Sequence, residues 1–185
     1  MPPSSRTKIQ ISKLDAATRQ LDTAIRLWFY SGDPVSIHTL AAAAHSVLHD
    51  VAKHQGKTSM LKDICSFFRP EKHKEIRDLL NEAQNFFKHA DKDPHGLLAF
   101  NPEVTEIFIL DAIFTYEALT GHLVALFGTF KTWMLLHHPE LMAEKLASTL
   151  PLNFESLRAQ VITLPKAQFL QTWLPAVLQY GAIKS

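Results

Sequence analysis

The segment from Asp33 to Gly56 constrains the fold most strongly, because it carries the signals for both ends of one long helix. The Asp33 carboxylate can accept hydrogen bonds from the free amides of a first helical turn. Pro34 follows at the first helical position, where its missing N–H costs nothing. Gly56 stands where a left-handed residue would end the helix. The sequence therefore predicts a helix over residues 34–55.

A second helix is expected directly before this one. Ser12 and Asp15 have the spacing of a capping box, and apolar residues then recur every three to four positions over residues 13–30. A short turn through Ser31 and Gly32 separates the two segments. A turn of this length joins neighbouring antiparallel helices, so we predict a helical hairpin at the N-terminal end.

The rest of the chain also follows helical spacing. Glycine is scarce, with six residues, and no stretch shows sustained alternation of apolar and polar residues. Beyond the hairpin we expect helices over about 59–68, 70–90 and 102–119, a further helix ending at 138, and shorter ones over about 140–149, 153–163 and 166–179. We predict an all-α fold, a helical bundle of about six to seven helices built on the N-terminal hairpin.

Three parts of the chain are expected. Residues 1–11 form a loosely ordered lead-in, and residues 12–138 form the bundle. Residues 139–185 form a C-terminal helical extension that packs on the bundle or on a partner chain. Pro151, Pro165 and Pro175 mark edges or kinks of its helices.

Composition narrows the class of protein. Apolar residues make up 46% and the formal net charge is +1, which is typical of a globular protein and argues against a nucleic-acid or membrane-surface partner. The apolar stretch 118–136 has the length of a membrane span, but Gly121, Gly128 and Lys131 interrupt it, so we interpret it as core. No apolar signal segment stands near the N-terminus, so we expect a cytoplasmic protein.

A homodimer is also expected. Trp28, Phe29 and Tyr30 are consecutive, so they point to different sides of one helix end. A compact bundle would leave part of this apolar surface for a second copy to cover.

Histidines supply the first candidate site. His38, His45 and His49 lie close together on one stripe of the 34–55 helix, beside its core face. His45 and His49 have the i, i+4 spacing that lets two imidazoles reach one metal ion. A third ligand would come from His89, and imidazoles with a carboxylate would suit zinc, iron or manganese.

A second group of polar residues surrounds the end of the 70–90 helix. Glu82, Asn85 and His89 share one stripe of that helix, and Asp91 and Asp93 follow in the turn after it. We predict a polar pocket in which the histidine stripe faces this group. Its residues would bind a ligand.

Three functions are compatible with these residues. The first is a binding or interaction module with a histidine-lined polar pocket and an unidentified small-molecule or protein ligand. The second is a metal-dependent hydrolase with His45, His49 and His89 as ligands and a carboxylate as the base. Without a metal ion, the same histidines would instead make hydrogen bonds to partners at helix boundaries.

The third function comes from a resemblance. The hairpin sequence AIRLWFYSGDPVSIHTLAAAAHSVL is similar to the small all-helical HEPN-like proteins, and the segments NFFKHAD and HHPE resemble a bacterial family without an assigned activity. The HEPN resemblance implies a dimeric bundle and an RNase or toxin-related role with an Arg and a His four to six residues apart. The nearest match, Arg69 to His73, has a proline after the arginine, and Asn85 to His89 has no arginine. No catalytic residue is therefore assigned.

Overall fold

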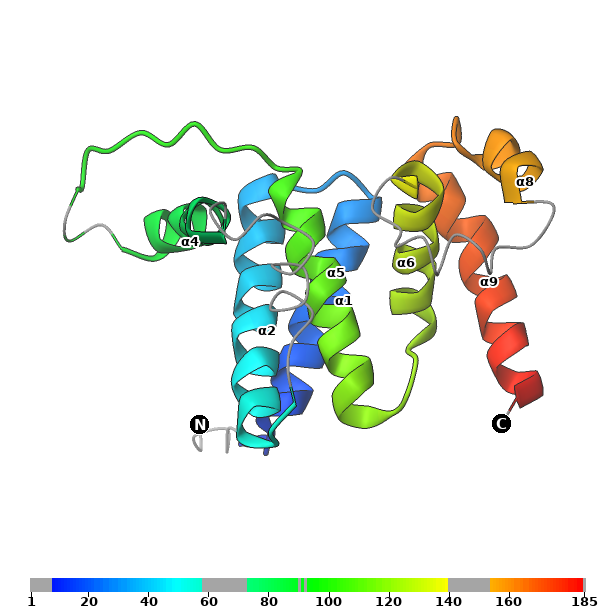
Figure 1. Ribbon diagram of the computed structural model, residues 1–185, viewed down its shortest axis with the longest axis horizontal. Coiled ribbons are helices and arrows are strands. Elements are labelled where there is room, and N and C mark those ends of the chain that lie inside the picture. Colours follow the sequence, from blue (N-terminus) through cyan, green and yellow to red (C-terminus); the bar gives the residue numbers. More distant parts are fainter. Residues whose placement is uncertain (1–7, 58–72, 90, 92, 140–153, 185) are drawn as a thin grey trace, which may run out of the picture.

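The computed structural model describes residues 8–57, 73–89, 91, 93–139 and 154–184. Seven helices and no strand are found among these residues, which confirms the all-α prediction (Figure 1). The helices are α1 (Lys13–Phe29), α2 (Pro34–His54), α4 (His73–Lys88), α5 (Val104–Thr120), α6 (Ala125–His137), α8 (Phe154–Val161) and α9 (Lys166–Lys184). The helices expected over 59–68 and 140–149 lie outside the described residues.

The N-terminal hairpin forms as predicted. Ser12 and Asp15 make the capping box at the start of α1, and Asp33 Oδ2 accepts from the backbone N–H of Ser36 at 2.7 Å. Hydrogen bonding from Ser36, through its side chain and then its backbone N–H, holds the pKa of the Asp33 carboxyl below its usual range. α2 ends before Gly56, whose φ of +68° is left-handed. The two capped helices pack along each other and form the base of the bundle.

An aromatic cluster joins α1 to α6 and α9. The Trp28 and Phe130 rings meet edge to face at 4.9 Å, and Phe29 stacks on Phe169 at 6.3 Å. Trp28 and Phe29 are thus core residues, and only Tyr30, with 57% of its surface exposed, faces solvent. The apolar surface used above to argue for a homodimer is therefore mostly covered within this chain.

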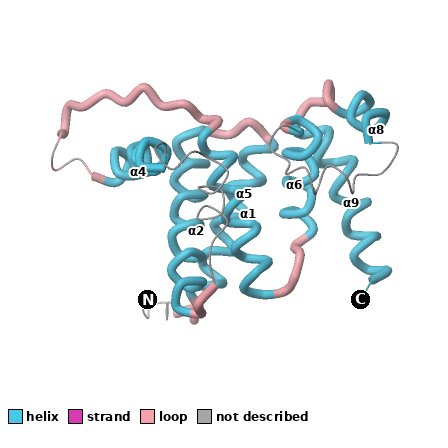
Figure 2. The backbone as a smooth tube through the Cα atoms, in the orientation of Figure 1, coloured by secondary structure: helices cyan, strands magenta, loops and turns pink. Residues whose placement is uncertain are grey.

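α5 packs against α2, while α4 lies apart from the bundle and contacts it through α2 (Figure 1). The connection from α4 to α5 runs as a long loop over one end of the bundle (Figure 2). This loop includes Asp93 to Phe100. Its course brings it over the first turns of α2 and α5.

α9 is longer than predicted. It continues through Pro175 to Lys184, whereas the sequence predicted an end near residue 179. Pro175 removes one helical hydrogen bond, to the carbonyl of Gln171. Both residues are exposed, so water can satisfy the released carbonyl and the helix need not end there.

The predicted break at Gly121 separates α5 from α6. Gly121 has a φ of +71°, and its N–H donates to the carbonyl of Glu117. No helix of the described residues is long and apolar enough to cross a membrane. The apolar stretch thus forms parts of two shorter helices that pack in the core.

We expect Gly121→Ala to lower the free energy of unfolding by about 1 kcal/mol. A Cβ at this position would meet no atom within 4 Å, so the whole cost is backbone strain at positive φ. Urea denaturation followed by circular dichroism measures the change. Gly121→Asn is the control, because asparagine tolerates the left-handed region, and it should lose less. Equal losses in the two variants would contradict this explanation.

Candidate functional site

Two histidines of the stripe on α2, His38 and His45, face α5. His38 is fully buried, and its Nδ1 lies 2.9 Å from Thr105 Oγ1. The rings of Phe87, Phe100 and Phe108 stand edge-on to the imidazole at 5.1–5.7 Å. Burial lowers the pKa of His38 to about 4, and the positive charge of Lys88 acts in the same direction. His38 is therefore neutral at pH 7 and belongs to the core.

His45 lies two helical turns after His38 on α2 and also contacts α5. Its Nε2 donates to Asp111 Oδ2 at 2.7 Å, and the Asp111 side chain has no exposed surface. The neighbouring His49 ring stacks on His45 at 6.3 Å but is 38% exposed, and its Nδ1 lies 3.9 Å from Asp50 Oδ1. The burial of the three histidines therefore decreases along the helix, from the fully buried His38 to the surface residue His49.

The geometry of the described residues does not support the predicted metal site. No three side chains of His, Cys, Asp or Glu within the described ranges are grouped so that they could hold a metal ion. His45 makes its hydrogen bond to Asp111, while His89 lies beyond the end of α4. The three residues His45, His49 and His89 do not form one ligand set.

The second predicted group does come together. An open depression of about 740 Å³ lies at the C-terminal end of α4 and the start of the following loop; we call it the α4 depression. It is lined by Glu82, Asn85, Phe86, His89, Asp91, Asp93, Leu97 and Leu98. All five polar residues predicted for this group line it. The α2 histidines do not line it: His38 and His45 contact Thr105 and Asp111 of α5, and His49 is a surface residue beside Asp50.

The α4 depression is acidic and partly apolar. Three of its lining residues are carboxylates, and within the part of the chain that the structure describes no Lys or Arg lines it. His89 Nδ1 lies 3.9 Å from Asp91 Oδ1, and both side chains are mostly exposed. Leu97, in the lining loop, is 99% exposed. Gln84 Nε2 donates to Ser46 Oγ at 3.2 Å and ties this end of α4 to α2.

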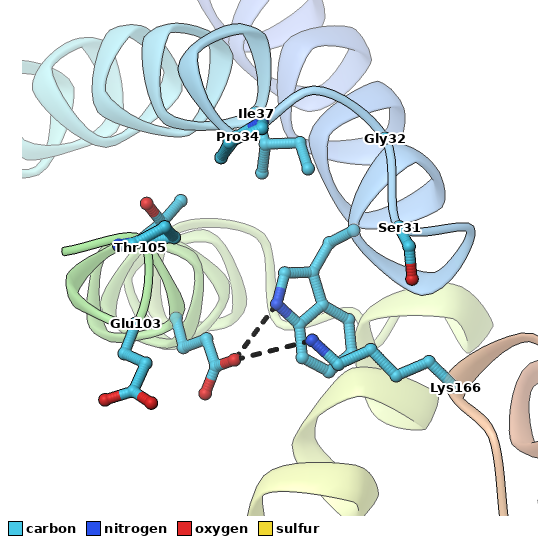
Figure 3. Close-up of a pocket in the computed structure, with 10 residues that line it drawn as sticks. Ser31, Gly32, Pro34, Ile37, Glu103, Thr105 and Lys166 are labelled. Carbon is cyan, nitrogen blue, oxygen red and sulfur yellow. Dashed lines mark hydrogen bonds and ion pairs between the residues drawn. The ribbon is translucent and has the colours of Figure 1, made fainter. Parts of the chain in front are cut away.

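A second cavity, of about 250 Å³, lies at the turn end of the hairpin; we call it the end pocket (Figure 3). Its lining comes from three separate stretches of the chain: Trp28, Ser31, Gly32, Pro34, Ile37, Pro102, Glu103, Thr105, Glu106 and Lys166. None of the site residues predicted from the sequence lines this pocket.

Glu106 is the centre of the end pocket. Its Oε1 accepts from Trp28 Nε1 at 3.1 Å and lies 3.7 Å from Lys166 Nζ, as the dashed lines in Figure 3 show. Its Oε2 lies 3.7 Å from His138 Nε2, and only 15% of the Glu106 side chain is exposed. A mostly buried carboxylate thus contacts an indole, an ammonium and an imidazole from three other segments.

Lys166 also covers the Trp28 ring, with Nζ 3.6 Å from the ring centroid. Burial lowers the pKa of the Lys166 ammonium, and the nearby carboxylates of Glu106 and Glu103 oppose that shift without cancelling it. One sequence signal could have pointed here. Glu106 and Asp111 are acidic residues within the largely apolar helix 104–120, and buried carboxylates need partners.

Comparisons with known proteins assign no family. No protein-family model, curated protein or solved structure matches this chain.

Proposed function

We propose that this chain is a helical binding module and that its ligand binds in the α4 depression. The supporting observation is that Glu82, Asn85, His89, Asp91 and Asp93 converge on one open depression of about 740 Å³. That volume is within the range of ligand-binding pockets, about 300–1,000 Å³. The exposed His89 and Asp91 side chains are accessible to a ligand without rearrangement of the core.

The charge of the lining favours a positively charged ligand. Glu82, Asp91 and Asp93 give the depression a negative field, and none of the described residues that line it is Lys or Arg. Phe86, Leu97 and Leu98 add an apolar wall. A ligand that combines ammonium or guanidinium groups with an apolar part matches both features.

Spermine is a suitable probe, because it carries several ammonium groups on an aliphatic chain. We expect Asp91→Asn/Asp93→Asn to weaken spermine binding about tenfold, since two exposed carboxylates contribute about 0.7 kcal/mol each. Isothermal titration calorimetry at low salt measures the affinity. Amide shifts of Asn85, Leu97 and Leu98 in NMR spectra report where spermine binds.

The matched control is Asp50→Asn/Glu155→Gln, which changes the net charge by the same amount at two exposed positions away from the depression. It should leave the affinity nearly unchanged. If both double variants weaken binding equally, spermine responds to net charge alone and the proposed site is wrong. Raising the salt concentration should weaken binding to the parent protein, because the charges are exposed.

The other functions have less support. A metal-dependent hydrolase would need a ligand set that the described residues do not contain, and Arg69 of the nearest HEPN-type pair lies outside those residues. Homodimerisation and a cytoplasmic location stay predictions. Light scattering at micromolar concentration tests the first, and a monomeric mass would contradict it.

A further inference from the structure

The end pocket combines charges of both signs with an apolar wall. Lys166, Glu103 and Glu106 supply the charges, and Pro34 and Ile37 supply apolar surface. Figure 3 shows Pro34 and Ile37 on one side of the pocket and Glu103 and Lys166 on the opposite side. A ligand in this pocket would therefore meet a positive group, a negative group and an aliphatic surface at once.

We propose that the end pocket binds a free aliphatic α-amino acid as its zwitterion, with the ligand carboxylate at Lys166 and the ligand ammonium at Glu103. The site is separate from the α4 depression, because the described residues that line the two cavities do not overlap. Failure of one proposal therefore leaves the other standing.

The Lys166 ammonium is placed to receive a carboxylate. Its Nζ lies 3.6 Å from the centroid of the Trp28 ring and 3.7 Å from Glu106 Oε1, and both contacts favour the charged form. An ammonium has three N–H donors, and these two contacts use two of them. The third can donate to a ligand oxygen, because the Lys166 side chain is 35% exposed and lines the pocket.

The two glutamates favour a ligand that also carries a positive charge. Burial lowers the pKa of Lys166, and Glu106 and Glu103 both act against that shift, so both carboxylates lie near the ammonium. They would repel a ligand that is only an anion, and Lys166 would repel one that is only a cation. Glu106 already contacts Trp28 and Lys166, whereas Glu103 is an exposed residue of the pocket wall. A ligand ammonium would therefore pair with Glu103.

The size and the apolar wall narrow the ligand further. The volume of about 250 Å³ is below the range of ligand pockets, about 300–1,000 Å³, so a small molecule is expected. Pro34, Ile37 and Pro102 line the pocket with aliphatic groups, which match an aliphatic side chain better than a polar one. Leucine combines such a side chain with the two charged groups on one carbon atom.

Three ligands with the same side chain test the charge pattern. L-Leucine has both charged groups, 4-methylpentanoate lacks the ammonium, and 3-methylbutylamine lacks the carboxylate. NMR titration of the full chain at millimolar ligand measures each affinity. The indole N–H of Trp28, which donates to Glu106 at 3.1 Å, reports binding in the end pocket. We expect L-leucine to bind about fivefold more tightly than either analogue, the upper value for one partly exposed ion pair.

Two variants assign the charged groups. Glu103→Gln should weaken binding of L-leucine about fivefold and should not weaken that of 4-methylpentanoate, which has no ammonium to pair. Lys166→Gln should weaken binding of L-leucine and of 4-methylpentanoate, but not that of 3-methylbutylamine. Glu155→Gln is the matched control for Glu103→Gln, because it removes the same charge from an exposed residue that lines neither cavity.

Three results would overturn the proposal. One is a Trp28 indole N–H signal that does not move with L-leucine. Another is binding of 3-methylbutylamine or 4-methylpentanoate as tight as that of L-leucine, because one of the two ion pairs would then contribute nothing. The third is an equal loss of L-leucine binding in Glu103→Gln and Glu155→Gln.

Discussion

Asp111→Ala should lower the free energy of unfolding by about 3 kcal/mol, because it breaks a buried charged hydrogen bond by removing one partner. Asp111 has no exposed side-chain surface and accepts from His45 Nε2 at 2.7 Å. Without the carboxylate, the mostly buried His45 ring loses its acceptor, and the space left in the core adds a cavity cost. Urea denaturation at pH 7, followed by circular dichroism, measures the loss.

Asp111→Asn is the first control. Its amide oxygen can still accept from His45 at the same place, so the expected loss is about 1 kcal/mol, the net value of one hydrogen bond. A loss from Asp111→Ala no larger than that from Asp111→Asn would contradict the role assigned to this pair.

A second control separates the α2 histidines. His45→Ala should destabilise the protein much more than His49→Ala, because the His49 side chain is 38% exposed and its nearest carboxylate, Asp50, is a surface residue. If His45 and His49 instead bound one metal ion together, each substitution would abolish metal binding. The two variants would then lose similar amounts of folding free energy. The comparison therefore also bears on the metal-site prediction.

The parts of the fold that depend on local signals were predictable from sequence. The caps at Ser12 and Asp33 and the break at Gly121 each rest on interactions within a few residues, and all three are found. The clustering of Glu82 with Asp91 and the residues between them is local in the same sense. One helix face and the turn after it can form a depression without help from distant elements.

The contacts of the α2 histidines were not predictable in this way. His38 and His45 meet residues 67 and 66 positions further along the chain, so their partners depend on which helix packs beside α2. Hydrophobic periodicity gives the core face of a helix but not its neighbour. The stripe was therefore correctly located beside the core face, but its partners on α5 could not be inferred.

The end pocket was missed for the same physical reason. Trp28, Glu106 and Lys166 come from three helices, and each looks ordinary by itself: a core tryptophan, a helix carboxylate and a surface lysine. Only the packing of α9 against α1 and α6 brings the lysine over the indole. Acidic residues within an apolar helix are the one sequence signal that identifies such positions in advance.

Lowering the pH should remove about 3 kcal/mol of stability through His38. Burial lowers the pKa of His38 from 6.5 to about 4 in the folded chain, whereas the unfolded chain keeps the ordinary value. Between these two pKa values the unfolded state binds more protons, so stability falls as the pH decreases from about 6.5 to about 4. Each pKa unit corresponds to about 1.4 kcal/mol. Well above pH 6.5 both states carry a neutral imidazole, so this contribution no longer changes with pH.

His38→Asn isolates the effect. The asparagine side chain can hydrogen-bond to Thr105 from the position that Nδ1 occupies in His38. The substitution removes the titratable Nε2 of the imidazole, which has no hydrogen-bond partner among the described residues. Urea denaturation of both proteins at pH 7, 6, 5 and 4.5 measures the difference in stability between them. The carboxylates that both proteins share, including Asp15 and Asp33, contribute equally to each and cancel in this difference. The parent should lose more stability than His38→Asn over this range, and parallel pH curves would contradict the prediction.

Hydrogen exchange should show where the structure opens when His38 takes up its proton. Because Phe87 and Phe100 cover the imidazole from α4 and the loop after it, exchange should speed up first in α4.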